Sequence, residues 1–295
     1  MTTEIVPMNI KRRVLIATLP SLLAGISASW AEPRPEVVSG AEITRILESP
    51  DRSAAERTND QRRKPESILN FIGVHPGAVA LDISAAGGYT TELLARTIGP
   101  TGTVYGQSRP LTPNQTPTPP AEREGNSHPN LAPAAAEPAR APRPSPVALA
   151  ERQARLEAAG ISAARIVAVS RPFEDPAPPE RAAAGIDLVT LMFNYHDLGH
   201  MGVDRTAMNK SVFQALKPGG LYIIADHAGR PGTGISEAGT LHRIEESFLR
   251  REVEAAGFKL LEEGTFLRNP NDPKDKNTPD PPQPKDEFVL KFVRP

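Results

Sequence analysis

The sequence contains no cysteine, which excludes disulfide bonds, thiolate catalysis and zinc sites built on sulfur. Aromatic residues make up 5% of the 295 residues, too few for a platform on which single-stranded nucleic acid would stack. The net charge is −1, so no overall charge attracts nucleic acid or an anionic membrane. The remaining composition, 39% hydrophobic and 23% charged, is ordinary for a globular protein of one or two domains.

The N-terminal region has the pattern of an export signal. A basic run, 11–13, precedes an apolar stretch, 14–27, that is too short to span a bilayer easily. Small residues around Ala31 predict cleavage there, so we expect 1–31 to be a signal peptide. The mature protein would then be periplasmic or secreted, without stable membrane insertion. The paired arginines also resemble a twin-arginine signal. The alternatives are an uncleaved anchor and a cytoplasmic protein.

The stretch 79–95 predicts a strand, a tight turn and a helix. Its apolar start fits a buried strand closed by Asp82, and the small residues 84–88 lead into an apolar-periodic helix. A ligand can lie against such a turn because no bulky side chain blocks the backbone, and the helix N-terminus offers free N–H groups. A dinucleotide fingerprint would need glycines where Ser84 and Ala86 stand, which argues against a nicotinamide enzyme. A plain strand-to-helix corner is the alternative.

Strands and helices alternate along the rest of the chain. We expect further strands at 103–106, 166–169, 186–193, 221–225, 259–267 and 287–293, and helices at 66–71, 147–159, 208–216 and 241–257. This alternation predicts an α/β fold with a doubly wound sheet and helices on both faces. The sheet domain would occupy 71–295 and follow an N-terminal helical segment at 32–70. Within that segment, the polar run 51–64 is interpreted as a solvated helix with ion pairs.

Two stretches are interpreted as lacking regular structure. Residues 109–146 are rich in Pro, Ala and Thr and contain almost no large apolar side chains. They cannot bury enough surface to offset the entropy of ordering, so we expect a disordered insert. Residues 269–285 are rich in Pro and Asp, and we expect a mobile loop there.

Histidines and aspartates follow the fourth and fifth predicted strands. His196 and His227 would meet at the carboxyl edge of the sheet, where open α/β sheets bind ligands. A histidine suits proton transfer near neutral pH, and His242, on a later helix, could close over the site. The candidate catalytic residues are thus His196, Asp197, His227 and His242. Each histidine could instead cap a loop, and the aspartates could cap helices.

These polar groups could also form a metal site of nitrogen and oxygen ligands. The residues concerned are His196, Asp197, Asp226, His227 and His242. Their spacing matches no strong zinc motif, so we predict no metal.

Three motifs are similar to the class I S-adenosylmethionine-dependent methyltransferase fold. They are LDISAAGGY at 81–89, LKPGGLYIIADH at 216–227 and AAGFKLLEE at 255–263. More narrowly, NYHD at 194–197 and the segment 225–246 resemble a bacterial family of predicted methyltransferases. The resemblance implies a Rossmann-like sheet that is mostly parallel with an antiparallel last strand. It also implies S-adenosyl-L-methionine as cofactor and a small-molecule substrate.

The same resemblance implies where the cofactor binds. Asp82 would lie beside the methionine moiety, Gln107 would face the ribose in place of the usual acid, and the loop after the third strand would border the adenine. Cofactor contacts are therefore expected from Asp82, Ser84, Ala86, Gly87, Gly88, Gln107, Phe173, Glu174 and Asn194. The alternative function is an exported, non-catalytic binding protein that kept the methyltransferase scaffold.

Overall fold

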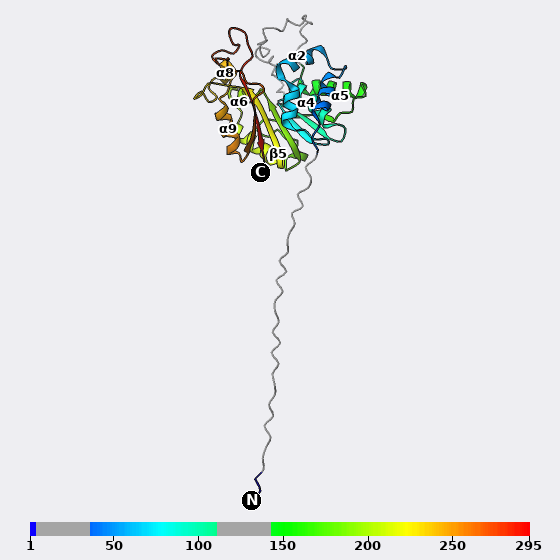
Figure 1. Ribbon diagram of the computed structural model, residues 1–295, viewed down its shortest axis with the longest axis vertical. Coiled ribbons are helices and arrows are strands. Elements are labelled where there is room, and N and C mark those ends of the chain that lie inside the picture. Colours follow the sequence, from blue (N-terminus) through cyan, green and yellow to red (C-terminus); the bar gives the residue numbers. More distant parts are fainter. Residues whose placement is uncertain (4–35, 111–142) are drawn as a thin grey trace. The chain divides into compact units, whose positions relative to one another are not determined.

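The structure, a computed structural model, describes residues 1–3, 36–110 and 143–295 (Figure 1). The chain divides into two units, Met1–Arg34 and Pro35–Pro295, and the second contains the folded domain. The predicted signal, apart from residues 1–3, and the centre of the predicted insert, 111–142, lie outside the described residues. Both interpretations stay predictions. Among the residues described, no helix is long and apolar enough to cross a membrane.

The described residues form a seven-stranded sheet with the order β3-β2-β1-β4-β5-β7-β6. The strands are β1 (Val79–Ile83), β2 (Thr103–Ser108), β3 (Arg165–Ser170), β4 (Ile186–Met192), β5 (Leu216–His227), β6 (Lys259–Gly264) and β7 (Glu287–Val293). The first five strands pair in parallel, whereas β7 runs antiparallel to both β5 and β6. The predicted doubly wound sheet with an antiparallel last strand is confirmed.

Helices cover both faces of this sheet. They are α1 (Gly40–Glu48), α2 (Ala54–Arg63), α3 (Pro65–Ile72), α4 (Tyr89–Ile98), α5 (Ser145–Ala158), α6 (Tyr195–His200), α7 (Arg205–Ala215), α8 (Ala238–Leu241) and α9 (Glu246–Ala255). Figure 1 shows α4 and α5 on one side of β5 and α6 and α9 on the other. Alternate residues of a strand face opposite sides. Accordingly, Leu81 packs in one core cluster with Leu249, and Ala80 in the other with Leu94.

The N-terminal helices pack more tightly than their polar sequence predicts. The run 51–64 is predicted to be a solvated helix. Two of its residues, Arg52 and Glu56, are instead only 4% and 7% exposed. Arg52 donates two hydrogen bonds to Asp60, at 2.6 and 2.7 Å, and Asp60 also accepts from the Tyr89 hydroxyl at 2.6 Å. Glu56 accepts from Arg152 of α5 at 2.6 Å. Charged groups tolerate burial when they are paired, so α2 docks through ion pairs instead of an apolar face.

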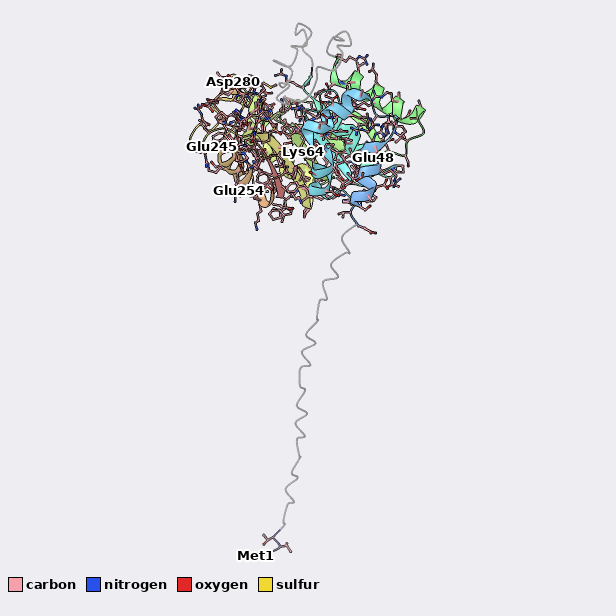
Figure 2. All side chains as sticks on the ribbon, turned by 45° about the horizontal axis from the view of Figure 1, so that its top comes forward. Met1, Glu48, Lys64, Glu245, Glu254 and Asp280 are labelled. Atoms are coloured by element: carbon pink, nitrogen blue, oxygen red, sulfur yellow. The ribbon has the colours of Figure 1, made fainter. Side chains whose placement is uncertain are left out.

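Other predicted boundaries change in the structure. Helix α5 begins at Ser145, so the insert ends earlier than residue 146. The predicted helix 241–257 is divided, because His242 adopts a left-handed conformation (φ 51°) after α8 and α9 begins only at Glu246. Lys64, labelled in Figure 2, is likewise left-handed and joins α2 to α3, and its Nζ donates to the Phe266 carbonyl at 2.7 Å.

The loop 269–285 contains no helix or strand, as predicted, but it is anchored to the domain. Arg243 and Asp272 are both buried, and the guanidinium donates to the two carboxylate oxygens at 2.8 and 3.1 Å. Lys285 at the end of the loop is 6% exposed. The loop therefore has a fixed attachment beside the carboxyl end of β5.

Candidate functional site

A cavity of about 700 Å³ lies at the carboxyl ends of β1, β4 and β5. Its walls are the turn after β1, the start of α6, the end of β5, His242 and two side chains of the loop 269–285. This volume falls in the range typical of small-molecule sites, and the position is where open α/β sheets bind ligands.

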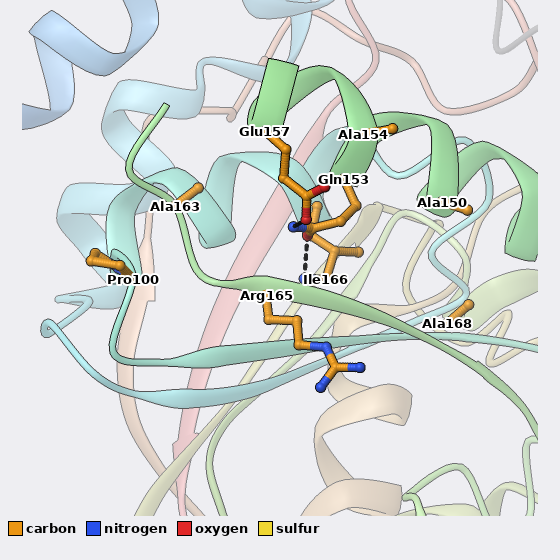
Figure 3. Close-up of a pocket in the computed structure, with 9 residues that line it drawn as sticks. All are labelled: Pro100, Ala150, Gln153, Ala154, Glu157, Ala163, Arg165, Ile166 and Ala168. Atoms are coloured by element: carbon orange, nitrogen blue, oxygen red, sulfur yellow. Dashed lines mark hydrogen bonds between the residues drawn. The ribbon is translucent and has the colours of Figure 1, made fainter. Parts of the chain in front are cut away.

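A second hollow, of about 570 Å³, lies between α5 and β3 (Figure 3). There Gln153 accepts a hydrogen bond from the backbone N–H of Ile166 at 2.8 Å. This bond satisfies an amide on the edge strand of the sheet. The lining residues Pro100 and Arg165 place the hollow toward the amino-terminal end of β3, away from the strand ends that gather polar groups. We therefore assign the first cavity as the candidate site.

In the turn after β1, two residues that are not glycine adopt the backbone conformation that favours glycine. Ser84 and Ala86 have positive φ angles, 61° and 46°, which cost an L-residue roughly 1–2 kcal/mol each. Ser84 is held by two bonds: its N–H donates to Gln107 at 3.0 Å and its hydroxyl donates to Asn194 at 2.7 Å. A side chain at Gly87 would meet no other described atom within 4 Å, and Gly87 lines the cavity. Strained backbone of this kind is concentrated at functional sites.

Gly88 lies in the same turn but faces α5. It has φ 77°, and a Cβ there would lie 2.6 Å from the Leu149 side chain and 2.8 Å from that of Arg152. Its role is to let α4 begin against α5, so the structure does not place it among the cofactor contacts.

Three other expected cofactor residues do not line the cavity. Gln107 is buried and engaged at both ends, because it accepts from Ser84 N–H and donates to the Arg171 carbonyl at 2.7 Å. Phe173 is 4% exposed and belongs to the hydrophobic core. Glu174 accepts from the backbone N–H of Asp204 at 3.2 Å. These placements do not support the ribose and adenine contacts that the resemblance implies.

Asp82 is a buried carboxylate at the floor of the cavity. It is 2% exposed and accepts from the hydroxyls of Thr91 at 2.6 Å and Thr190 at 2.8 Å. Burial raises the pKa of Asp82 to about 6, although both threonine hydrogen bonds lower it. A carboxylate kept in a position that disfavours its charge is typical of functional sites.

Asp82→Asn is expected to stabilise the protein in a pH-dependent way. Because the folded-state pKa is raised, wild-type stability falls as pH rises from about 4 to about 6 and stays lowered above that range. The neutral amide avoids this loss, which corresponds to about 3 kcal/mol. In urea unfolding at pH 8, the variant should have the higher free energy of unfolding. At pH 4 the free energies of unfolding of the two proteins should be equal. A variant that is equally destabilised at both pH values would contradict the assignment.

His196 is fixed between two carboxylates. Its Nδ1 lies 2.6 Å from Asp226 Oδ1 and its Nε2 lies 3.1 Å from Asp197 Oδ1. Burial lowers the pKa of His196, but the charge of Asp226 and the bonds to both carboxylates outweigh it and raise the pKa to about 10. At neutral pH His196 is a cation that donates to both neighbours. It has no lone pair for a proton, so the structure does not support it as the general base.

The other predicted histidines gather around His196. The ring centroids of His227 and His242 each lie 5.5 Å from that of His196. His227 is 2% exposed, with Nδ1 2.9 Å from Glu287 Oε1. His242 lies with Nδ1 3.2 Å from Asp197 Oδ1. Burial raises the pKa of Asp197, but the neighbouring His196 and His242 lower it by more. The pKa of Asp197 is therefore lowered overall. The predicted catalytic set is thus brought together.

Some cavity residues were not selected from the sequence. His200 has its Nδ1 3.8 Å from Asp197, and its spacing of four from His196 on one helix was an available signal. Asn277 and Lys285 come from the Pro-rich loop, where no pattern marks them, and Lys285 donates to Asn277 at 2.8 Å.

Comparison with known proteins supports the fold. No family model and no curated protein matches this chain. Among solved structures, a SAM-dependent methyltransferase from Aquifex aeolicus matches 88% of this chain and 100% of its own, with 13% identity and a TM-score of 0.50. The cyclase SpnF matches 84% of this chain and 86% of its own, with 14% identity and a TM-score of 0.50. The domain therefore has the Rossmann-like methyltransferase fold.

Proposed function

We propose that this protein is an S-adenosylmethionine-dependent methyltransferase that acts on a small molecule. The observation that carries the proposal is one cavity that extends from the strained turn after β1 to the histidine–aspartate cluster after β4 and β5. The first end suits a cofactor held by backbone groups, and the second suits an acceptor that must be activated.

The residues at the turn fit the amino-acid half of the cofactor. Residues 84–87 line the cavity, and Gly87 leaves room for a ligand against the chain. Gln107 is already engaged, so on the side of β2 the ribose half would instead meet Arg109, which follows that strand and lines the cavity. When bound, S-adenosylmethionine would supply an electrophilic methyl group on its sulfonium sulfur.

The cluster after β4 and β5 would orient and activate the acceptor. His196 provides a fixed positive charge, and Asp197 links it to His242 through a shared carboxylate oxygen. If Nδ1 of His242 donates to Asp197, its Nε2 is left as an acceptor for a proton. Positioning of two reactants in one cavity is the main contribution that a protein makes to such a transfer.

His242→Ala should keep cofactor binding and lose turnover by about 10²-fold or more, the usual contribution of a positioned acid–base group. The assay should follow the methyl group itself, by mass spectrometry of a panel of hydroxylated and carboxylated acceptors. This matters because the cyclase SpnF shares the fold, and fold does not determine reaction. His75→Ala is the matched control, because His75 lies in the loop before β1 and outside the cavity lining. Equal loss in both variants would contradict a role for His242.

A further inference from the structure

We propose that His196, Asp197 and His242 form a binding site for one divalent transition-metal ion in the wall of the cavity. The proposal rests on the arrangement of these three side chains and holds whether or not the protein transfers methyl groups. Only the use of the ion in acceptor activation, described below, rests on the proposed function.

The three candidate ligand atoms are already close together. They lie within 4.8 Å of one another. Nε2 of His196 and Nδ1 of His242 are 3.1 and 3.2 Å from the same oxygen, Oδ1 of Asp197. Ligands bound at about 2.0–2.2 Å in tetrahedral or octahedral geometry are roughly 2.8–3.6 Å apart. An ion could therefore enter between them with small side-chain movements.

Two of these ligands are oriented by outer hydrogen bonds. Asp226 holds Nδ1 of His196 at 2.6 Å and is itself fixed by the backbone N–H groups of His196 and His227, both at 2.8 Å. The outer oxygen of Asp197 accepts from Asn194 at 2.8 Å. A carboxylate behind a histidine, on the nitrogen away from the ion, is the usual arrangement around bound metals. It directs Nε2 of His196 and Oδ1 of Asp197 toward the proposed ion.

The ligand types indicate which ions the site prefers. Two imidazole nitrogens and one carboxylate oxygen suit Zn²⁺, Co²⁺, Mn²⁺ or Fe²⁺, whereas Mg²⁺ and Ca²⁺ prefer oxygen ligands alone. On binding, the ion replaces the proton on Nε2 of His196, which is released to solvent. Three protein ligands leave a position open toward the cavity. With Nδ1 of His242 on the ion, Nε2 carries the ring proton, so in this form the ion replaces His242 as the activating group. In the proposed reaction, an acceptor hydroxyl would bind at the open position and lose its proton more readily.

The sequence could not indicate this site by spacing. His196 and Asp197 are adjacent on α6, whereas the third ligand comes 45 residues after Asp197, from the left-handed turn after α8. The sequence-based prediction of no metal is therefore replaced by this proposal.

The test is metal titration of tag-free protein that has been stripped with a chelator. Visible absorption with Co²⁺ and calorimetry with Zn²⁺ should each show one ion per chain, and Mg²⁺ should not bind. His242→Ala should weaken Zn²⁺ binding roughly 100-fold or more, because even loss of an outer partner costs about 10–100-fold. Asp226→Asn should weaken Zn²⁺ binding by about 10–100-fold. The control His75→Ala should bind Zn²⁺ like wild type. Melting curves verify that each variant is folded.

The decisive variant is His242→Ala, because this side chain is 19% exposed and its removal leaves the core intact. Wild-type protein that binds neither Co²⁺ nor Zn²⁺, or a His242→Ala protein that binds as tightly as wild type, would overturn the site. Metal binding that requires His242 supports the site even if no methyl transfer is detected, in which case only the proposed function fails.

Discussion

Gly87→Leu is expected to weaken S-adenosylmethionine binding roughly 100-fold or more, equivalent to about 2.7 kcal/mol, without lowering the melting temperature. A Cβ at this position would meet no other described atom within 4 Å, so the new side chain can enter the cavity without disturbing the fold. It would then occupy the space that the cofactor needs against the turn. Calorimetry measures the affinity, and a melting curve measures the stability.

Two neighbouring substitutions provide the controls. Gly87→Ala adds one methyl group and should lose far less affinity. Gly88→Leu should unfold the protein, because Gly88 has φ 77° and any side chain collides with Leu149. Affinity in Gly87→Leu equal to that of wild type would mean that the ligand does not lie on the turn.

Arg243→Ala should lower the free energy of unfolding by about 3–5 kcal/mol, the cost of leaving one member of a buried ion pair alone. Both side chains of the pair are fully or almost fully buried. Asp272 accepts two bonds from Arg243 and one from the backbone N–H of Asp286 at 2.6 Å. Without the guanidinium, the carboxylate is left as an uncompensated buried charge. Urea unfolding measures the loss.

A double variant separates charge from packing. Arg243→Met combined with Asp272→Asn removes both charges while keeping an oxygen for the Asp286 amide, and should recover more than half of the loss. Hydrogen exchange should also increase across 269–285 in Arg243→Ala, since this pair anchors the loop that carries Lys285 into the cavity. A loss of stability below about 1 kcal/mol would show that the loop is held by other contacts.

The fold could be predicted because its signals are local. Buried parallel strands give continuous apolar runs such as 186–193, and the small-residue turn 84–88 marks the corner between β1 and α4. The gathering of His196 and His227 at one edge also followed, since parallel neighbours place their carboxyl ends together.

The predictions that differ from the structure concern residues whose surroundings depend on contacts far apart in the sequence. The polar pattern of α2 hides the burial of Glu56, which depends on Arg152, 96 residues further along the chain. Gln107 was assigned to a ligand because nothing local reveals that Ser84 and Arg171 engage it. Likewise, the pKa of His196 is raised by Asp226, 30 residues away, together with the adjacent Asp197, so a residue chosen as a base is held as a cation.

The central claim is that the cavity beside the turn 84–87 binds S-adenosylmethionine. The most direct test is calorimetric titration of the wild-type chain with S-adenosylmethionine, S-adenosylhomocysteine and NAD⁺ side by side. The account predicts one site per chain for the first two ligands, with dissociation constants below about 1 mM, a usual upper limit for enzyme substrates, and no binding of NAD⁺. Absence of heat with both adenosyl ligands at millimolar concentration, or tighter binding of NAD⁺, would contradict it.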